Sequence, residues 1–184
     1  NIAPLEILRS DEIIKLFDLC DLNILTGSKF FISAVKKSCK PYLIFGAGNV
    51  PVYIDEKINL SKVSKLIVES KSFDYSTSCS ADSVLIIHQK IYEKFLKELK
   101  KNKVYILNDS EKKKLDDIYF KRGMVNTQIL AKDPSLILSK IGTQVKKKIK
   151  VIGYEFSSQV SSHYIMDEKI LPLLAMPLNA ASMP

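Results

Sequence analysis

Short apolar runs alternate with amphipathic stretches along most of this chain, and that alternation is the feature that most restricts its fold. The apolar runs are rich in β-branched residues and bounded by glycine, proline or polar residues, which is typical of buried strands. They are residues 22–27, 41–49, 50–55, 83–88, 103–108 and 148–156, the last of which is the final strand that the pattern predicts. Strands separated by helices predict an α/β fold: a three-layer, mostly parallel sheet with helices on both faces.

The stretches between these runs carry helical signals. Residues 91–102 place Ile91, Phe95 and Leu99 on one helical face. Asp109 or Ser110 is suited to cap the helix that follows the fifth run, because a short polar side chain satisfies backbone N–H groups there. Further helices are expected over residues 28–39, 59–72, 110–120 and 134–140.

The composition is that of an ordinary globular protein. The 184 residues are 46% hydrophobic and 26% charged, enough to build one domain or most of one. No apolar run approaches the roughly 20 residues of a membrane span. The first residues lack the basic start and cleavage site of a signal peptide, so we expect a cytoplasmic protein without membrane contact.

The formal net charge of +8 raises the question of nucleic-acid binding. The lysines cluster in residues 97–103, 111–114 and 146–150, mixed with glutamates and without interleaved aromatic residues. Base-stacking surfaces usually carry such aromatic residues. We therefore expect solvated helix faces and turns, and no nucleic-acid partner; a basic nucleic-acid-binding domain is the less favoured alternative.

Cysteine usage leaves one candidate for chemistry. The three cysteines form no CxxC pair and the two histidines are scattered, so neither a disulfide framework nor a metal site is expected. Small or polar residues surround Cys79 from Ser76 to Ala81, which leaves a sulfur room for a substrate. Two interpretations of Cys79 stay open: a catalytic nucleophile or an inert buried thiol. If it is a nucleophile with a histidine base, the fold must bring His88 or His163 next to it.

Three segments share motifs with one enzyme family. Residues 21–55 run through a strand, a TG turn and a helix into GAGNVPVYID. Residues 67–99 contain SKSFDYSTSCS before a strand and a helix, and residues 167–176 read DEKILPLLAM. In order and spacing they resemble the CoA-acylating branch of the aldehyde dehydrogenase superfamily, across nearly the whole chain.

The resemblance implies thiol chemistry at Cys79. In that family the cysteine attacks a small aldehyde, hydride passes to NAD or NADP, and coenzyme A resolves the resulting thioester. Gly46, Gly48 and Asn49 match the turn beside the thiol, where hydrolytic relatives carry a water-activating glutamate. A turn without a carboxylate favours transfer of the acyl group to another thiol, since water has no general base there.

The resemblance also implies cofactor contacts. Thr26 and Gly27 match the turn that faces the cofactor, and Glu168 matches the glutamate that hydrogen-bonds the nicotinamide ribose. In the segment before the thiol, Tyr75 and Ser76 stand where the family has Asn-Gly.

The same resemblance predicts the domain organisation. Residues 1–40 are expected to be the tail end of a nucleotide-binding region, and residues 41–184 a catalytic domain that is incomplete at its C-terminus. We therefore expect a fragment of a homo-oligomeric enzyme, inactive when isolated. The alternative is a degenerate, non-catalytic relative that acts as a structural or assembly domain.

Overall fold

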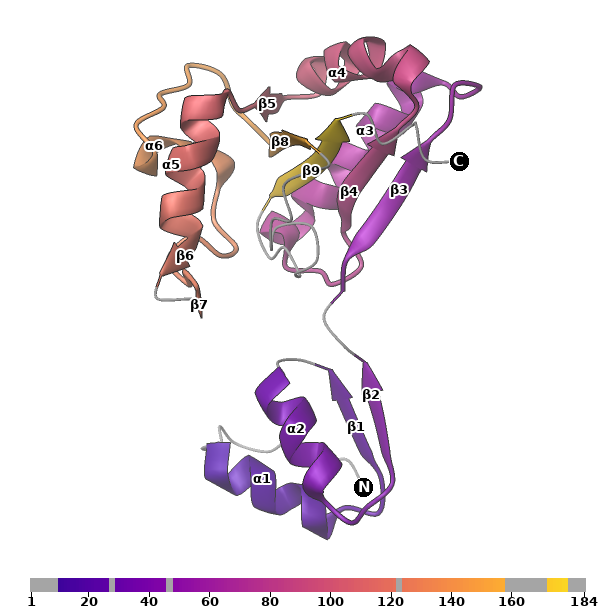
Figure 1. Ribbon diagram of the computed structural model, residues 1–184, viewed down its shortest axis with the longest axis vertical. Helices are drawn as coiled ribbons and strands as arrows, with labels where there is room; N and C mark the ends of the chain where they lie inside the picture. The colour runs from indigo at the N-terminus through magenta and orange to yellow at the C-terminus, as the bar shows by residue number, and fades with distance from the viewer. Residues whose placement is uncertain (1–9, 27–28, 46–47, 122–123, 158–171, 179–184) are drawn as a thin grey trace. The chain divides into compact units, whose positions relative to one another are not determined.

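The computed structural model describes residues 10–26, 29–45, 48–121, 124–157 and 172–178 (Figure 1). The chain divides into two compact units, Asn1–Ala47 and Gly48–Pro184. The expected assignment of residues 1–40 to a nucleotide-binding region and of residues 41–184 to a catalytic domain stays a prediction.

The first unit is a small α/β layer. Its elements are α1 Ser10–Leu19, β1 Asn23–Thr26, α2 Lys29–Lys37 and β2 Tyr42–Phe45. The two strands run parallel, with Asn23 opposite Tyr42, and the Asn23 side chain donates to the carbonyl of Phe17 over 2.9 Å. Helix α1 was not predicted from the sequence.

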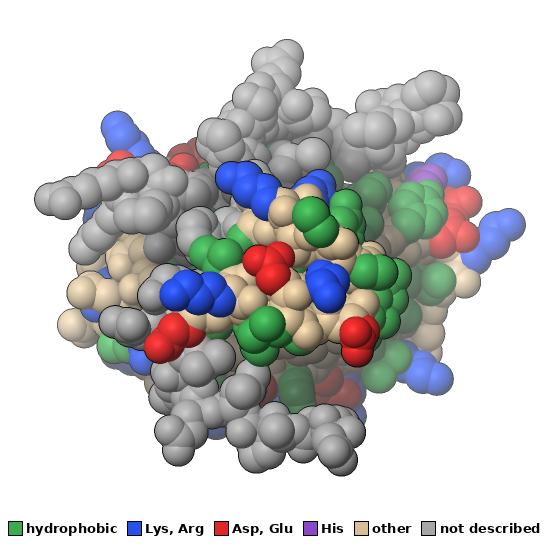
Figure 2. All heavy atoms as spheres, turned by 90° about the horizontal axis from the view of Figure 1, so that it is seen from below, with side chains coloured by type: hydrophobic (Ala, Val, Ile, Leu, Met, Phe, Trp, Pro, Cys, Tyr) green, Lys and Arg blue, Asp and Glu red, His purple; other side chains and the backbone are tan. Residues whose placement is uncertain are grey.

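Much of the apolar surface of this unit is exposed. Phe17 and Val35 are buried, whereas Ile24 and Phe45 are 68% and 56% exposed. Hydrophobic side chains are visible among acidic and basic ones on the face that Figure 2 presents. Among the described residues of the first unit, the buried hydrophobic side chains are Phe17 and Val35, so its own core is small.

The second unit is built on a five-stranded sheet. Its order is β3 Val50–Ile54, β4 Asp82–Ile87, β9 Leu173–Leu178, β8 Val151–Ser157 and β5 Val104–Ile106. Every neighbouring pair is parallel. The predicted α/β fold with a parallel sheet is confirmed, and because all the strands point the same way, the loops that enter them gather at one edge of the sheet.

Strand β9 is central in this sheet, and the sequence pattern did not predict it. It lies between β4 and β8, pairing Ala175 with both Val84 and Tyr154. A strand buried on both faces reads as a continuous apolar run instead of an alternating one. Residues 173–178 form such a run, but it is only six residues long and includes Pro177.

Helices cover both faces of the sheet. Helices α3 Leu60–Ser72 and α4 Tyr92–Lys101 pack on one face, and α5 Asp109–Tyr119 and α6 Pro134–Lys140 on the other. Leu174 and Met176 of β9 belong to the core under α3 and α4, whereas Leu173 and Ala175 belong to the opposite core. This alternation confirms the predicted three layers. A short hairpin follows α5, formed by β6 Phe120–Lys121 and β7 Met124–Val125.

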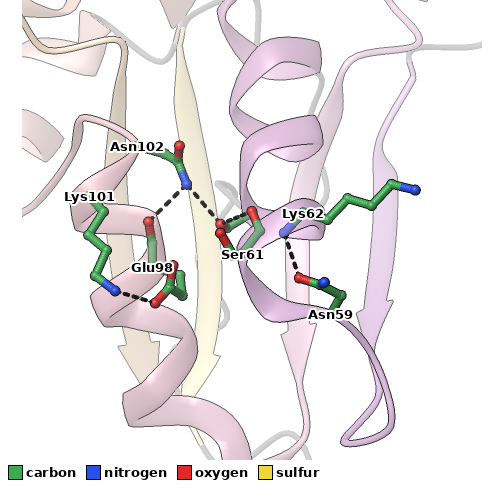
Figure 3. A network of polar contacts seen from close by, with 7 residues as sticks. Asn59, Ser61, Lys62, Glu98, Lys101 and Asn102 are labelled. Atoms are coloured by element: carbon green, nitrogen blue, oxygen red, sulfur yellow. Dashed lines mark hydrogen bonds and ion pairs between the residues drawn. The ribbon is translucent and has the colours of Figure 1, made fainter.

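Polar contacts join α3 to the end of α4 (Figure 3). The Asn102 amide donates to Ser64 Oγ over 2.8 Å and to the Glu98 carbonyl over 3.1 Å, so it closes α4 and binds the neighbouring helix. Asn59 caps the start of α3 by accepting from the backbone N–H of Lys62.

The cap of α5 differs from the expected one. Asn108 accepts from the backbone N–H of Glu111, and Glu111 accepts in return from the backbone N–H of Asn108. This reciprocal pair is a capping box, and it makes the prediction of a cap at Asp109 or Ser110 wrong. Asp109 is instead the first residue of the helix.

Candidate active site

Cys79 lies in the segment between α3 and β4, residues 73–81, which we term the Cys79 loop. Cys79 is exposed, so the interpretation of a buried thiol is wrong. The loop enters β4, which places the cysteine at the edge where the sheet strands begin. Ligands in open α/β sheets commonly bind at the opposite edge, where strands end, so that general rule alone would misplace this site.

Three hydrogen bonds hold the base of the Cys79 loop. The backbone N–H of Asp82 donates to Ser70 Oγ over 3.3 Å. At the next residue of each element, the Lys71 ammonium donates to Ser83 Oγ over 3.4 Å. The Ser83 hydroxyl in turn donates to the Ala81 carbonyl over 3.0 Å. The last turn of α3 is thereby joined to the first residues of β4, which holds the two ends of the loop together.

Lys71 is a residue that sequence reasoning missed. It is fully buried, and lysine is almost never so placed unless its charge is compensated. The signal was available, because the family segment S-K-x-F-D matched here contains a lysine at this position. Burial shows that this lysine supports the loop from inside and does not belong to the solvated surface.

The backbone of the Cys79 loop contains a rare run of left-handed residues. Asp74, Tyr75 and Ser76 have φ values of 44°, 51° and 67°. The Asp74 carboxylate accepts a hydrogen bond from the Thr77 hydroxyl, which helps to hold the turn. Asparagine and glycine adopt this conformation at lower cost than other residues, which accounts for the Asn-Gly of the family at Tyr75 and Ser76.

Gly48 of the predicted turn lies directly against the cysteine. A Cβ atom built on Gly48 would lie 2.5 Å from the carbonyl oxygen of Cys79, a separation that real side chains do not adopt. Only glycine allows this approach. The structure therefore brings Gly48 and Cys79 together, with Asn49 next in the chain; Gly46 lies outside the described residues.

The predicted cofactor residues are described only in part. Thr26 is the last residue of β1 in the first unit and is exposed. The end of a parallel strand is where nucleotides bind in α/β folds, so its position fits the predicted role. Gly27 and Glu168 lie outside the described residues, and the cofactor site stays a prediction.

His88 is far from the thiol. It follows β4, whereas Cys79 precedes it, and six residues of strand correspond to roughly 20 Å. The His88 ring instead accepts from the backbone N–H of Lys90. A Cys79–His88 pair is therefore not formed, and His163 lies outside the described residues.

The described residues contain neither a metal-binding cluster nor a helix that could span a membrane. No group of three or more histidine, cysteine or carboxylate side chains is placed to hold a metal ion within the part of the chain that the structure describes. Among the same residues, no helix is both long and apolar enough to cross a membrane.

An exposed thiol on a short anchored loop, with Gly48 against its backbone, defines a candidate thiol enzyme of the α/β class. The sequence profile of the Aldehyde dehydrogenase family matches residues 21–116, which include the turn, the Cys79 loop and the strands that hold them. The chain belongs to the aldehyde dehydrogenase family.

Similar proteins narrow the assignment to the CoA-acylating branch of the family. The acylating sulfoacetaldehyde dehydrogenase of Bilophila wadsworthia is 29% identical over 90% of this chain and 37% of its own length. The crystal structure of an acetylating aldehyde dehydrogenase from Geobacillus thermoglucosidasius is 33% identical with a TM-score of 0.85, covering 92% of this chain and 38% of that one.

A third similar protein was solved with CoA bound. The propionaldehyde dehydrogenase of Rhodopseudomonas palustris, with bound CoA and an acylated cysteine, is 26% identical with a TM-score of 0.78. The match covers 91% of this chain and 38% of that one. The chain thus spans less than two fifths of the length of each of these three proteins.

Proposed function

We propose that this chain supplies the catalytic thiol of a CoA-acylating, NAD(P)-dependent aldehyde dehydrogenase that converts a small aldehyde into an acyl-CoA. The observation that carries the proposal is the close approach of Gly48 to an exposed Cys79. It brings Gly48, from a turn whose sequence contains no carboxylate, next to the candidate nucleophile, as expected for transfer of the acyl group to a thiol. The CoA and acylated cysteine of the Rhodopseudomonas enzyme support the same chemistry.

In this mechanism the Cys79 thiolate attacks the aldehyde carbon, and the carbonyl oxygen becomes an oxyanion. The backbone N–H of Cys79 is the expected donor to that oxyanion. Hydride leaves the former carbonyl carbon as the C–O double bond reforms, which gives a thioester on Cys79; NAD or NADP supplies the hydride acceptor. The thiolate of CoA then attacks the thioester and releases Cys79.

The residues of the loop and turn have supporting roles in this proposal. Lys71 holds the base of the Cys79 loop, and Gly48 leaves space at the thiol's own backbone. Thr26, Gly27 and Glu168 remain the candidate cofactor contacts. The proposal also includes a Rossmann-like nucleotide region that residues 1–40 complete, a cytoplasmic location and self-association of the longer protein.

One observation favours the alternative of a degenerate, non-catalytic relative. Tyr75 and Ser76 adopt left-handed conformations without the Asn-Gly that suits them. A site released from selection for catalysis accumulates such mismatches. The two functions differ in whether Cys79 is chemically activated.

Acyl transfer from acetyl-CoA tests the proposal without needing hydride transfer. The 184-residue chain is incubated with acetyl-CoA at neutral pH, and acetylated cysteines are mapped by mass spectrometry. We expect acetyl on Cys79, with release of CoA, at a rate at least about tenfold above that of Cys39. Cys39 is also exposed, so it is the control for exposure alone.

Equal acetylation of Cys79 and Cys39 would favour the degenerate relative. The Cys79→Ser variant provides the background rate. Since Cys79 makes no contribution to the buried core, this variant should melt at the temperature of the unmodified chain, which is checked by circular dichroism.

A further inference from the structure

Two lysine clusters that are far apart in the sequence meet around one hollow in the second unit. Residues 97–103 end α4 and lead into β5, and residues 146–150 lead into β8. The hollow between them has a volume of about 480 Å³. We term it the lysine hollow; its lining is Lys100, Lys101, Lys103, Val104, Lys147, Lys148 and Ile149.

Backbone hydrogen bonds hold the two clusters in place. The N–H of Lys150 donates to the carbonyl of Lys103 over 2.9 Å, and the N–H of Lys103 donates to that of Lys100 over 3.1 Å. Val104 pairs with Val151 one step further into the sheet. The start of the β5–β8 pair therefore fixes the backbone of both clusters side by side, so their lysine side chains extend from neighbouring positions.

The charge in the lysine hollow is largely uncompensated. Lys101 pairs with Glu98 at 2.6 Å (Figure 3). No carboxylate of the described residues lies within ion-pair distance of the other lining lysines, Lys100, Lys103, Lys147 and Lys148. Like charges so gathered repel one another, and an anion placed between them relieves that repulsion.

We propose that the lysine hollow binds a small molecule that carries two or more phosphate groups. Lysine is an established phosphate binder through its compact positive charge. The volume lies within the range of small-molecule sites. The buried side chains of Val104 and Ile149 form an apolar floor on which an attached organic group packs.

The shape of the hollow favours a small ligand over a nucleic acid. The lysines converge on one concavity, whereas surfaces that bind nucleic-acid strands follow the backbone in a groove and stack bases on aromatic side chains. No aromatic residue lines the lysine hollow within the described part of the chain.

The lysine hollow also borders the surroundings of the candidate thiol. Lys148 and Ile149 line a second hollow of about 240 Å³, whose wall includes Asp74 and Tyr75 of the Cys79 loop. Two sources of the ligand follow: a free nucleotide, or the phosphates of CoA. Both present the same chemistry to the lysines, and binding measurements can separate them.

Isothermal titration calorimetry of the 184-residue chain at low salt tests the proposal. The probes are inorganic tripolyphosphate, ATP and CoA. We expect tripolyphosphate to bind, and the Lys100→Gln/Lys147→Gln variant to weaken it by about tenfold or more, because one charge is lost from each cluster. Raising the salt concentration should weaken binding through screening.

A matched control is the Lys62→Gln/Lys113→Gln variant, which removes the same total charge from α3 and α5. Both of these lysines are exposed and lie outside the hollow, so binding should be unchanged. All four substituted lysines are exposed, and circular dichroism melting verifies that both variants fold. Equal weakening by the two variants would overturn the proposal, because it would show a general charge effect.

The probes distinguish the remaining outcomes. Tighter binding of CoA than of ATP, sensitive to Lys100→Gln/Lys147→Gln, identifies CoA as the source, and the reverse order identifies a nucleotide. Absence of tripolyphosphate binding overturns the proposal. Duplex DNA that binds through these lysines where tripolyphosphate does not would replace the small ligand with a nucleic acid. Acetylation of Cys79 is measured separately, so failure here leaves the proposed function standing.

Discussion

The Cys79 loop and the polar cluster around Glu111 differ in the burial of their functional groups: Glu111 is buried and Cys79 is exposed. Glu111 is 8% exposed and accepts hydrogen bonds from Tyr105 Oη at 2.8 Å, the Asn108 N–H at 2.9 Å and Thr143 Oγ1 at 2.7 Å. This carboxylate joins β5, α5 and the segment after α6. The Cys79 loop instead has an exposed thiol and three consecutive left-handed residues.

The difference separates stability from function within one domain. A buried carboxylate with several donors stabilises the fold, because removing it leaves those donors unpaired. Backbone strain and an exposed nucleophile add nothing to stability and are commonly found where a protein does chemistry. Substitutions in the Glu111 cluster should therefore mainly change the free energy of unfolding, and substitutions around Cys79 should mainly change the reactivity of its thiol.

The largest expected effect is that of Glu111→Ala. It leaves the Tyr105 and Thr143 hydroxyls and the Asn108 N–H without their acceptor, which should lower the free energy of unfolding by about 3 kcal/mol. Urea denaturation followed by circular dichroism measures this value. Acetylation of Cys79 should be unchanged in the folded protein. A loss below the precision of the measurement would show that water replaces the carboxylate.

The Gly48→Ala substitution should affect the other region. Its new Cβ meets the Cys79 carbonyl, so the backbone must shift, at a cost of about 2 kcal/mol. We expect the acetylation rate of Cys79 to fall toward that of Cys39, measured by mass spectrometry.

Gly142→Ala is the control for Gly48→Ala. Gly142 has a φ of 82°, but its Cβ would meet nothing closer than the end of the Lys114 side chain at 4.0 Å. This variant should lose about 1 kcal/mol through strain alone and keep the reactivity of Cys79. If both variants reduce acetylation equally, the close approach of Gly48 is not specific to the thiol.

The Glu111→Gln variant tests the charge of the cluster with little change of shape. Burial raises the pKa of Glu111, but hydrogen bonds from the Asn108 backbone, Thr143 and Tyr105, together with the charge of Lys114, outweigh it and hold this pKa below its usual value. A lowered pKa in the folded state stabilises the protein above the unfolded pKa of about 4.3. This contribution is lost as the pH falls through the folded pKa.

The stability difference between the unmodified chain and Glu111→Gln should therefore be greatest near neutral pH and shrink below about pH 4. Urea denaturation at several pH values gives this difference, and taking the difference cancels most of the titration of other carboxylates. A difference that is constant down to pH 3 would contradict the role assigned to the charge.

The sequence predicted the parts of this comparison that depend on local patterns. Helix α6 has the predicted bounds, Pro134–Lys140, because proline and Gly142 mark its ends. Strand β9 was missed, since a short apolar run with a proline carries no periodic signal. The cap at Asn108 was missed because neighbouring Asp109 and Ser110 are equally suitable residues by type.

Long-range placement could not be predicted from these patterns. The approach of Gly48 to Cys79 was expected only through family resemblance, and nothing local indicated that Lys71 is buried. The lysine clusters looked like separate solvated runs, because the pairing of β5 with β8 that brings them together joins residues more than 40 positions apart. Contacts of this kind depend on the order of the strands, which alternation alone leaves open.

The smallest expected effect is that of Tyr75→Asn, which restores one residue of the Asn-Gly of the family. Tyr75 has a φ of 51° and is about half exposed, so the substitution removes little buried surface. Asparagine adopts the left-handed conformation more readily, and the free energy of unfolding should rise by about 0.5 kcal/mol.

The control is Tyr53→Asn at an exposed, extended position of β3, where asparagine is unfavourable and a small loss of stability is expected. Opposite signs for the two variants in urea denaturation would show that the Cys79 loop is strained by its own sequence. The same sign for both would mean that the loop conformation costs nothing at Tyr75, and the contrast with the Glu111 cluster would then rest on hydrogen bonding alone.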